Sequence, residues 1–271
     1  MSIQIAAVQM ISAPEVGPNL VMAVRLIAEA ADQGARLVAL PEYFPIIGPS
    51  DATRLQAREA DGNGPLQDFL AAAAQRHGIW LVGGSIPLTS AHPDKLLNSC
   101  LVFDPAGQRV ARYDKIHLFG FSKGAETYDE AQTIEAGPAK PVTFDLTIDG
   151  GTIRVGLGIC YDLRFPEMFR AMGPVDLIVL PAAFTDTTGQ AHWEILLRTR
   201  AIENQCYVLA SAQGGQHPTG RMTHGNSMII DPWGEILARI DKGEGVVQAA
   251  LEPARIAEIR TSLPALQHRR L

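Results

Sequence analysis

The 271-residue chain is 46% hydrophobic and 19% charged, which is enough apolar material for the core of one large domain or two ordinary ones. Its net charge of −6 comes from interspersed acidic and basic residues, so we expect neither a nucleic-acid nor a membrane partner. No apolar run reaches the ~18 residues that cross a bilayer. Three cysteines, an odd number, and a first apolar run without a basic leader predict a cytoplasmic protein.

Strands and helices alternate in the first half of the chain, which closes with a hairpin. Asn19 is expected to cap the first helix and Gly34 to end it, and Gly78 closes a second amphipathic helix. The Asp-Pro-Ala-Gly sequence at residues 104–107 has the turn chemistry of a hairpin. The predicted strands are residues 3–9, 37–40, 79–86, 98–103 and 109–116.

The second half repeats the order of the first. A sheet with helices on one face leaves its other face bare, and two such halves bury their bare faces by stacking. We therefore predict one α/β domain over residues 1–271, a four-layer α-β-β-α sandwich with an internal pseudo-twofold duplication. A single doubly wound sheet is the competing architecture. The matching segments are residues 153–156 with 3–6, 177–184 with 37–44, and 226–242 with 98–115.

An apolar strand predicted over residues 153–159 leads directly into Cys160. Pro166 and Glu167 then suit a first helical turn, so the thiol should sit between a strand end and a helix start. That position suits a nucleophile. The alternative is that Cys160 is a small buried hydrophobe, as most cysteines are.

The alignment of the two halves suggests a partner for this thiol. Met10 faces Cys160, and Ala182 faces Glu42, so each half carries one ionisable group at an equivalent strand end. Pseudo-symmetry would bring these strand ends to one side of the stacked sheets. We therefore expect Glu42 and Cys160 to share a site.

Lys115 and Lys242 occupy matching positions in the two halves. Lys115 ends the strand predicted over residues 109–116, and its apolar neighbours should draw it inward, where a lysine needs a carboxylate partner. Alternatively, Lys115 is an exposed charge at a strand end and Glu42 a surface cap after Pro41.

Three separated segments resemble the signature segments of the nitrilase, or carbon-nitrogen hydrolase, superfamily, in the right order and over essentially the whole chain. The resemblance implies a catalytic triad of Glu42, Lys115 and Cys160 on an α-β-β-α sandwich that forms homodimers or higher homo-oligomers. A second family glutamate falls on Glu130, with Glu126 as the nearby alternative, and the helix and tail of residues 252–271 could contact the dimer partner. The segments are Leu40-Pro41-Glu42, Tyr113-Asp114-Lys115-Ile116-His117 and Gly158-Ile159-Cys160-Tyr161-Asp162.

The chemistry of these residues agrees with an amidase. A cysteinyl thioester divides amide hydrolysis into two easier steps. Glu42 would take the thiol proton, pass it to leaving ammonia and then activate water. Lys115 and the backbone N–H of Tyr161 would stabilise the oxyanion, a contribution of ~3 kcal/mol for one such donor. The seven histidines show no paired ligand spacing, so we expect neither a metal nor a cofactor.

Further stretches resemble the Nit subgroup of this superfamily, which holds omega-amidase and deaminated glutathione amidase. Tyr161 and Asp162 follow the nucleophile where nitrilases usually have Trp-Glu, which favours amide over nitrile hydrolysis. Residues 212–217 and 263–270 resemble the deaminated-glutathione type more closely. The stretches that resemble the subgroup are residues 160–167, 184–194 and 200–208.

Substrates of that subgroup carry a 2-oxo acid carboxylate remote from the amide, so a cation is expected nearby. Arg164 is the candidate because a guanidinium can grip a carboxylate in two places; alternatively, it forms a salt bridge with Glu167 or Asp162. By resemblance, Phe184 and Thr188 would line the same substrate pocket.

The predicted function is hydrolysis of a small amide with release of ammonia. Deaminated glutathione is the first substrate expected, and the omega-amidase substrates 2-oxoglutaramate and 2-oxosuccinamate are the second. Two further alternatives are an N-carbamoyl amidohydrolase and a non-catalytic binding protein. The absence of an Asn-Asp-Arg-Arg type sequence after Cys160 argues against the former, and the intact Glu-Lys-Cys set argues against the latter.

Overall fold

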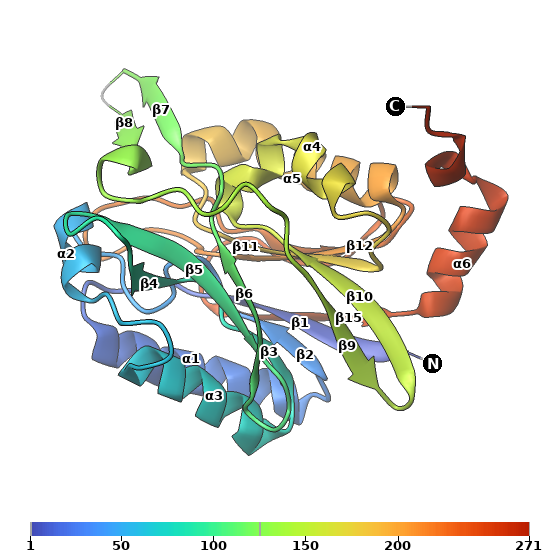
Figure 1. Cartoon of the computed structure of the whole chain (residues 1–271), viewed down its shortest axis with the longest axis horizontal. Helices are drawn as coiled ribbons and strands as arrows, with labels where there is room; N and C mark the ends of the chain where they lie inside the picture. Colours follow the sequence, from blue (N-terminus) through green and yellow to red (C-terminus); the bar gives the residue numbers. More distant parts are fainter. Residues whose placement is uncertain (1, 125, 271) are drawn as a thin grey trace.

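The computed structural model describes residues 2–124 and 126–270. Two sheets lie face to face, with α1 and α3 outside one and α4 and α5 outside the other (Figure 1). The four-layer α-β-β-α sandwich predicted from the sequence is confirmed. The helices are α1 (Val16–Asp32), α2 (Asp51–Gln56), α3 (Pro65–His77), α4 (Pro166–Ala171), α5 (Asp186–Asn204) and α6 (Pro253–Ser262), with 3-10 helices η1 (Glu130–Gln132), η2 (Cys160–Arg164) and η3 (Ala265–His268).

The two sheets share one topology except for the additional strand β4 in the first. The first runs β15-β1-β2-β3-β5-β4, with β6 also paired to β5, and the second runs β14-β13-β12-β11-β10-β9. The first contains β1 (Ile3–Gln9), β2 (Leu37–Ala39), β3 (Trp80–Val82), β4 (Ile86–Thr89), β5 (Leu96–Phe103), β6 (Arg109–Asp114) and β15 (Gly245–Leu251). The second contains β9 (Thr143–Ile148), β10 (Gly151–Leu157), β11 (Leu177–Ala182), β12 (Tyr207–Ala212), β13 (Ser227–Ile230) and β14 (Ile236–Ile240).

In each sheet, three parallel strands lie between antiparallel neighbours. The parallel strands are β1-β2-β3 in one half and β10-β11-β12 in the other. An antiparallel strand flanks each set, β15 beside β1 and β9 beside β10, and an antiparallel pair follows β3 and β12. This repeated order confirms the duplication and excludes a single doubly wound sheet.

The central strands are buried on both faces, so their sequences show little polar alternation. In β1, Ile5 and Ala7 belong to the core that includes the second sheet, whereas Ala6 and Val8 pack with residues of α1 and α3. Successive side chains of a strand point to opposite faces, and here both faces are covered. The parallel strands therefore read as short apolar runs.

The structure corrects the prediction for Asn19. This residue is buried within α1, and the N-cap position belongs to Glu15. The Asn19 amide accepts a hydrogen bond from Ala13 N at 2.7 Å and donates to Pro45 O at 2.8 Å. The asparagine therefore joins two loops instead of starting a helix.

The single strand predicted over residues 79–86 is in fact β3 and β4, separated by a short break. Gly84 in this break has φ +57°, and a Cβ there would lie 2.2 Å from the carbonyl oxygen of Pro41. Ser85 Oγ accepts a hydrogen bond from Tyr43 N at 3.0 Å. The break therefore lets the chain approach closely to the loop that carries Glu42.

The hairpin of β7 (Gly120–Lys123) and β8 (Glu126–Asp129) stands outside the two sheets, and α6 leads the C-terminal tail away from them (Figure 1). The Arg260 guanidinium anchors α6 by donating to the carbonyl of Gln205 at 3.2 Å. Within residues 2–124 and 126–270, no helix has both the length and the apolarity to span a membrane.

Candidate active site

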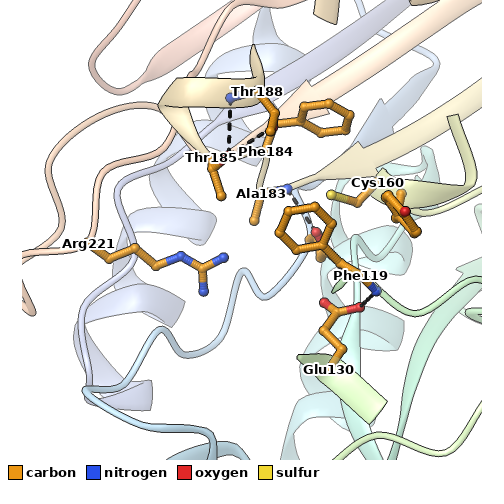
Figure 2. A pocket seen from close by; sticks show the side chains of 10 residues that line it. Phe119, Glu130, Cys160, Ala183, Phe184, Thr185, Thr188 and Arg221 are labelled. Atoms are coloured by element: carbon orange, nitrogen blue, oxygen red, sulfur yellow. Dashed lines mark hydrogen bonds between the residues drawn. The ribbon is translucent and has the colours of Figure 1, made fainter. Parts of the chain in front are cut away.

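Glu42 and Cys160 line one small pocket beyond the ends of parallel strands (Figure 2). Glu42 follows β2, and Cys160 follows β10, so the equivalent strand ends of the two halves do meet. Seven of the ten lining residues come from other elements or loops. The pocket is lined by Glu42, Phe119, Glu130, Cys160, Tyr161, Ala183, Phe184, Thr185, Thr188 and Arg221.

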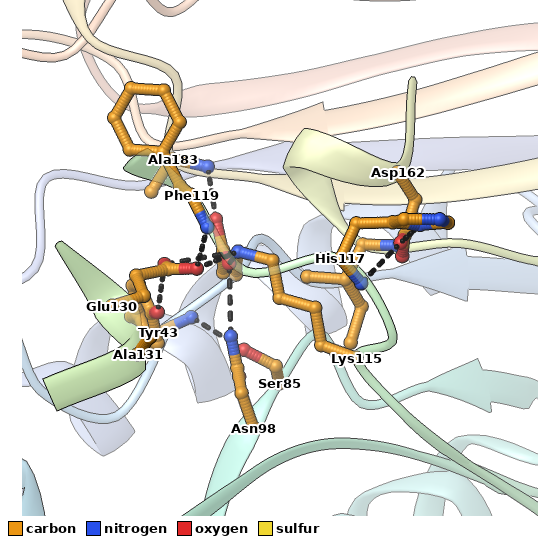
Figure 3. A network of polar contacts seen from close by, with 12 residues as sticks. Tyr43, Ser85, Asn98, Lys115, His117, Phe119, Glu130, Ala131, Asp162 and Ala183 are labelled. Carbon is orange, nitrogen blue, oxygen red and sulfur yellow. Dashed lines mark hydrogen bonds and ion pairs between the residues drawn. The ribbon is translucent and has the colours of Figure 1, made fainter. Parts of the chain in front are cut away.

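Lys115 lies behind the pocket, immediately after β6, with its side chain fully buried. Its Nζ donates to Glu42 Oε1 at 2.9 Å and to Glu130 Oε2 at 2.8 Å (Figure 3). Burial works to lower the pKa of Lys115, but the Glu130 and Glu42 carboxylates outweigh it and raise the pKa well above its usual value. The lysine therefore remains an ammonium within the protein. Lys242, which the sequence matched with Lys115, is half exposed and pairs with Asp186, and the strand register places Asp241 at the position equivalent to Lys115.

The Glu42 carboxylate is held by donors from both halves of the chain. Asn98 Nδ2 donates to Oε1 at 3.0 Å, next to the bond from Lys115, and Ala183 N donates to Oε2 at 2.8 Å. Ala183 adjoins Ala182, the residue that the duplication aligns with Glu42. These three bonds fix the orientation of a carboxylate that is only 1% exposed.

The structure groups Glu130, and not Glu126, with Lys115. Glu130 accepts hydrogen bonds from Tyr43 Oη at 2.7 Å and Phe119 N at 2.8 Å in addition to the lysine. Burial works to raise the pKa of Glu130, but the charge and hydrogen bond of Lys115 and the other donors outweigh it and lower the pKa. Glu126 instead accepts a hydrogen bond from Thr187 Oγ1 at 2.8 Å.

Cys160 is the first residue of η2 and has a positive φ of 50°. Such a backbone conformation is unusual for a residue with a Cβ, and it is found where a sharp turn presents a functional side chain. Burial raises the pKa of the Cys160 thiol well above its usual value, and the Glu42 carboxylate raises it further against the opposing effect of Lys115. The resting side chain is therefore a neutral thiol.

The neutral thiol leads to a prediction for alkylation. Because only the thiolate reacts, the rate of Cys160 carbamidomethylation by iodoacetamide should still be rising at pH 9. Peptide mass spectrometry over pH 6–9.5 measures this rate, with free cysteine in the same buffer as the control. A rate that reaches its plateau below pH 7 would show a resting thiolate and contradict the prediction.

The buried carboxylate of Asp162 connects the residues on either side of Lys115 with the residue before Cys160. It accepts hydrogen bonds from Tyr113 Oη at 2.7 Å and from His117 Nδ1 at 2.7 Å, two residues before and after the lysine. It also accepts from Ile159 N at 2.8 Å, next to the cysteine. Asp162 therefore sets the position of one catalytic candidate relative to the other (Figure 3).

We expect Asp162→Asn to lower kcat roughly 100-fold, since the amide cannot accept all of these hydrogen bonds, and to destabilise the fold by about 1–3 kcal/mol. Steady-state kinetics and thermal unfolding measure the two effects. Tyr113→Phe removes one donor only and should give a smaller loss of both quantities. A variant with unchanged kcat despite reduced stability would limit Asp162 to a structural role.

Arg164 lies beside the pocket and not in its wall. Its guanidinium carbon is 5.5 Å from the centre of the Phe184 ring, and its Nη1 is 3.2 Å from Nδ1 of His192. It forms a salt bridge with neither Glu167 nor Asp162 among the described residues. Of the residues expected around the substrate, Tyr161, Phe184 and Thr188 do line the pocket.

Sequence reasoning missed several residues of the site. Asn98 gave a usable signal, because it begins one of the matched hairpins and precedes the strand residue that pairs with the end of β6. Phe119 and Arg221 lie in irregular segments without periodicity, so no local pattern identifies them.

Among residues 2–124 and 126–270, no cluster of three or more His, Cys, Asp or Glu side chains is arranged to hold a metal ion.

Comparisons with known proteins agree with this geometry. A family model described as carbon-nitrogen hydrolase matches residues 4–261. The chain is 42% identical over 268 residues to deaminated glutathione amidase from Synechocystis sp., covering 97% of each chain. It is 37% identical over 272 residues to omega-amidase NIT2 from Homo sapiens, covering 99% of this chain and 95% of that one.

Two solved structures are also similar. Nit3 from Saccharomyces cerevisiae, a member of branch 10 of the nitrilase superfamily, has a TM-score of 0.85 at 31% identity and covers 100% of this chain and 97% of its own. A mutant amidase from Nesterenkonia sp. AN1, with acrylamide added to its active-site cysteine, has a TM-score of 0.78 at 26% identity, with coverages of 97% and 98%.

Proposed function

The chain belongs to the carbon-nitrogen hydrolase family and is an amidase, and we propose that it acts through a cysteinyl thioester on Cys160. Glu42 is the general base, and Lys115 stabilises the oxyanion. The observation that carries the proposal is the buried Glu42–Lys115 ion pair, at 2.9 Å, with the glutamate and the thiol in the wall of one pocket. The acrylamide adduct on the active-site cysteine of a similar amidase supports the same nucleophile.

In the proposed reaction, Cys160 Sγ attacks the amide carbon while Glu42 takes the thiol proton. The negative charge that forms on the carbonyl oxygen faces the Lys115 ammonium and the N–H of Tyr161, which lies in the first turn of η2 and has no partner within that helix. Glu42 gives its proton to the nitrogen as the C–N bond breaks. It then takes a proton from water, which hydrolyses the thioester to a carboxylic acid and restores the thiol.

Deaminated glutathione is the first substrate we propose, and an omega-amidase substrate is the second. Support comes from the higher identity to the relative named for deaminated glutathione, 42% against 37%. Glutathione contains an acyl group on cysteinylglycine, so cleavage of that amide in its deaminated form releases an amine. The ammonia expected from the sequence would come only from a primary amide such as 2-oxoglutaramate.

A substrate panel tests this order. Ammonia and free amine are measured for deaminated glutathione, 2-oxoglutaramate, glutamine, carbamoyl amino acids and simple nitriles, and kcat/KM ranks the substrates. We expect the highest value for deaminated glutathione. A higher value for 2-oxoglutaramate would reverse the order, and hydrolysis of none of the amides would contradict the amidase mechanism.

Arg164 is proposed to bind the 2-oxo acid carboxylate, with Tyr161, Phe184 and Thr188 around the acyl chain. This requires the guanidinium to leave His192, 3.2 Å away, and turn toward the pocket. We expect Arg164→Ala to raise KM roughly 10- to 100-fold for carboxylate-bearing acyl groups, since a hydrogen bond to a charged group contributes about 1.5–3 kcal/mol. Neutral amides should lose little, and an equal loss on both would exclude the assignment.

We also propose a cytoplasmic homodimer. The outward face of α5 exposes Ile195 and Ile202, with 65% and 50% of their surface accessible, and Leu263 is exposed at the end of α6. Unpartnered apolar side chains on one helix face favour burial against a second copy. Light scattering should give twice the 29.2 kDa mass, and a double Ile195→Glu, Ile202→Glu variant should be monomeric.

The proposed cytoplasmic location is supported by the three cysteines, which are all free, buried thiols and suit a reducing compartment.

A further inference from the structure

A second, larger cavity of about 530 Å³ opens beside the reaction pocket. Phe119, Glu130 and Arg221 belong to the walls of both, so the two spaces adjoin. The reaction pocket itself has about 10 Å³ of free space, room for roughly one water molecule. A substrate longer than the reacting amide must therefore extend elsewhere, and this outer cavity has the necessary volume.

The outer cavity has one guanidinium that is already paired and one that is not. Arg54 forms a salt bridge with Asp51, and its guanidinium carbon lies 4.1 Å from the centre of the Tyr43 ring. Arg221 forms no salt bridge within residues 2–124 and 126–270. Its guanidinium carbon lies 5.6 Å from the centre of the Tyr128 ring, and the guanidinium points into the space beside Glu130 (Figure 2). Arg221 is therefore the cation available to a ligand.

One nitrogen of this guanidinium and one hydroxyl of a neighbouring residue are buried and lack hydrogen-bond partners in the described part of the chain. Arg221 Nε and Thr219 Oγ1 have no hydrogen-bond partner among the described residues, although both are shielded from solvent. Both residues belong to the wall of the outer cavity. A buried donor without a partner costs about 1–3 kcal/mol, so a shift of these side chains that turns both atoms toward a bound anion would satisfy a guanidinium and a hydroxyl together.

The position of the proton donor decides which half of a substrate reaches this cavity. The leaving nitrogen has to face Glu42 to receive its proton, and Glu42 is linked through Lys115 to Glu130. Glu130 also lines the outer cavity. Because Phe119, Glu130 and Arg221 are shared by both walls, a substituent on this nitrogen can extend into the outer cavity, and we assign the acyl group to the side of Tyr161 and Phe184.

We infer that the outer cavity is a leaving-group subsite for an amine that carries a carboxylate, such as an amino acid or short peptide, and that Arg221 and Thr219 bind this carboxylate. The inference rests on the proposed amidase function and extends it to the amine half of the substrate. The subsite favours secondary amides of anionic amines over primary amides. Arg221 thereby determines which leaving amine is preferred, whereas Arg164 acts on the acyl side of the scissile bond.

Three amides with one 2-oxo acyl group test the inference: the primary amide, the amide of glycine and the amide of glycinamide. Product amine and ammonia are both measured. Arg221→Gln should lower kcat/KM roughly 10- to 100-fold for the glycine amide, mainly through KM, and much less for the other two. Arg221→Lys should recover part of the loss, and Thr219→Val should give a smaller loss in the same direction.

The outcomes separate this inference from the amidase proposal. If the wild-type enzyme cleaves the primary amide but not the glycine amide, the subsite is wrong and the amidase mechanism stands. Equal losses on all three amides, in Arg221→Gln protein with unchanged thermal unfolding, would place Arg221 on the acyl side and overturn the inference. Unchanged kinetics on the glycine amide in both Arg221→Gln and Thr219→Val would overturn it as well.

Discussion

Cys160→Ala removes amide hydrolysis while the protein stays folded. The substitution deletes the only atom that can form the proposed thioester, so we expect kcat to fall roughly 10⁴-fold or more. The side chain is 7% exposed and lines the pocket, so the loss of one sulfur leaves space that water can fill. Two independent measurements test this. Steady-state assays measure product release by the variant, and mass spectrometry looks for an acyl adduct on the Cys160 peptide of the wild-type protein.

Cys206→Ala is the matched control for this variant. Cys206 is also a free, buried thiol, but it packs in the core of the second sheet, away from the pocket. We expect this variant to keep its activity and to lose about 1 kcal/mol of stability, as a small core truncation does. An active Cys160→Ala protein, or an acyl adduct on another residue, would remove the basis of the mechanism.

Lys115→Met inactivates the enzyme and also destabilises it. The substitution leaves the Glu42 and Glu130 carboxylates buried without their cation, and breaking a buried ion pair in this way costs about 3–5 kcal/mol. It also removes a proposed donor to the oxyanion. Chemical denaturation measures the stability, and kcat at saturating substrate measures the catalytic loss.

The pH dependence of this variant has a defined sign. In the wild-type protein, the pKa of Glu130 is lowered by Lys115, so its ion pair stabilises the fold above the unfolded-state pKa, and this stability is lost as pH falls through the folded-state pKa. Without Lys115, burial raises the pKa of Glu130, so the folded state favours the protonated form of this carboxyl group. The stability gap between wild type and Lys115→Met should therefore narrow from pH 7 to pH 5.

Lys242→Met is the control, because Lys242 also follows the second strand of a hairpin, in the other half of the chain, but lies at the surface. Its side chain is 47% exposed and pairs with Asp186 at 2.9 Å. A surface ion pair contributes at most about 1 kcal/mol, so stability and activity should change little. Equal effects of the two substitutions would mean that burial of Lys115 has no energetic consequence.

The strand register explains why the two lysines differ in burial. Lys115 lies opposite Asn98 at the end of its hairpin. In the other half, Asp241 lies opposite Asn226, so Lys242 is one residue beyond the equivalent position. Lys115 meets Glu42 and Glu130, whereas Lys242 meets Asp186 near the start of α5 and remains in solvent. The sequence predicted that the two lysines match, and the register of the second hairpin corrects this match by one residue.

The sequence by itself determined the alternation of strands and helices in the first half, the duplication and the convergence of Glu42 and Cys160. Apolar runs and turn residues are local signals, and parallel strands place their carboxyl ends at one edge whatever the details of the loops. Only the tertiary structure decided that Glu130 and not Glu126 joins Lys115, and that Arg221 lines the pocket while Arg164 lies beside it. These outcomes depend on irregular segments far apart in the chain, whose contacts follow no period that a sequence displays.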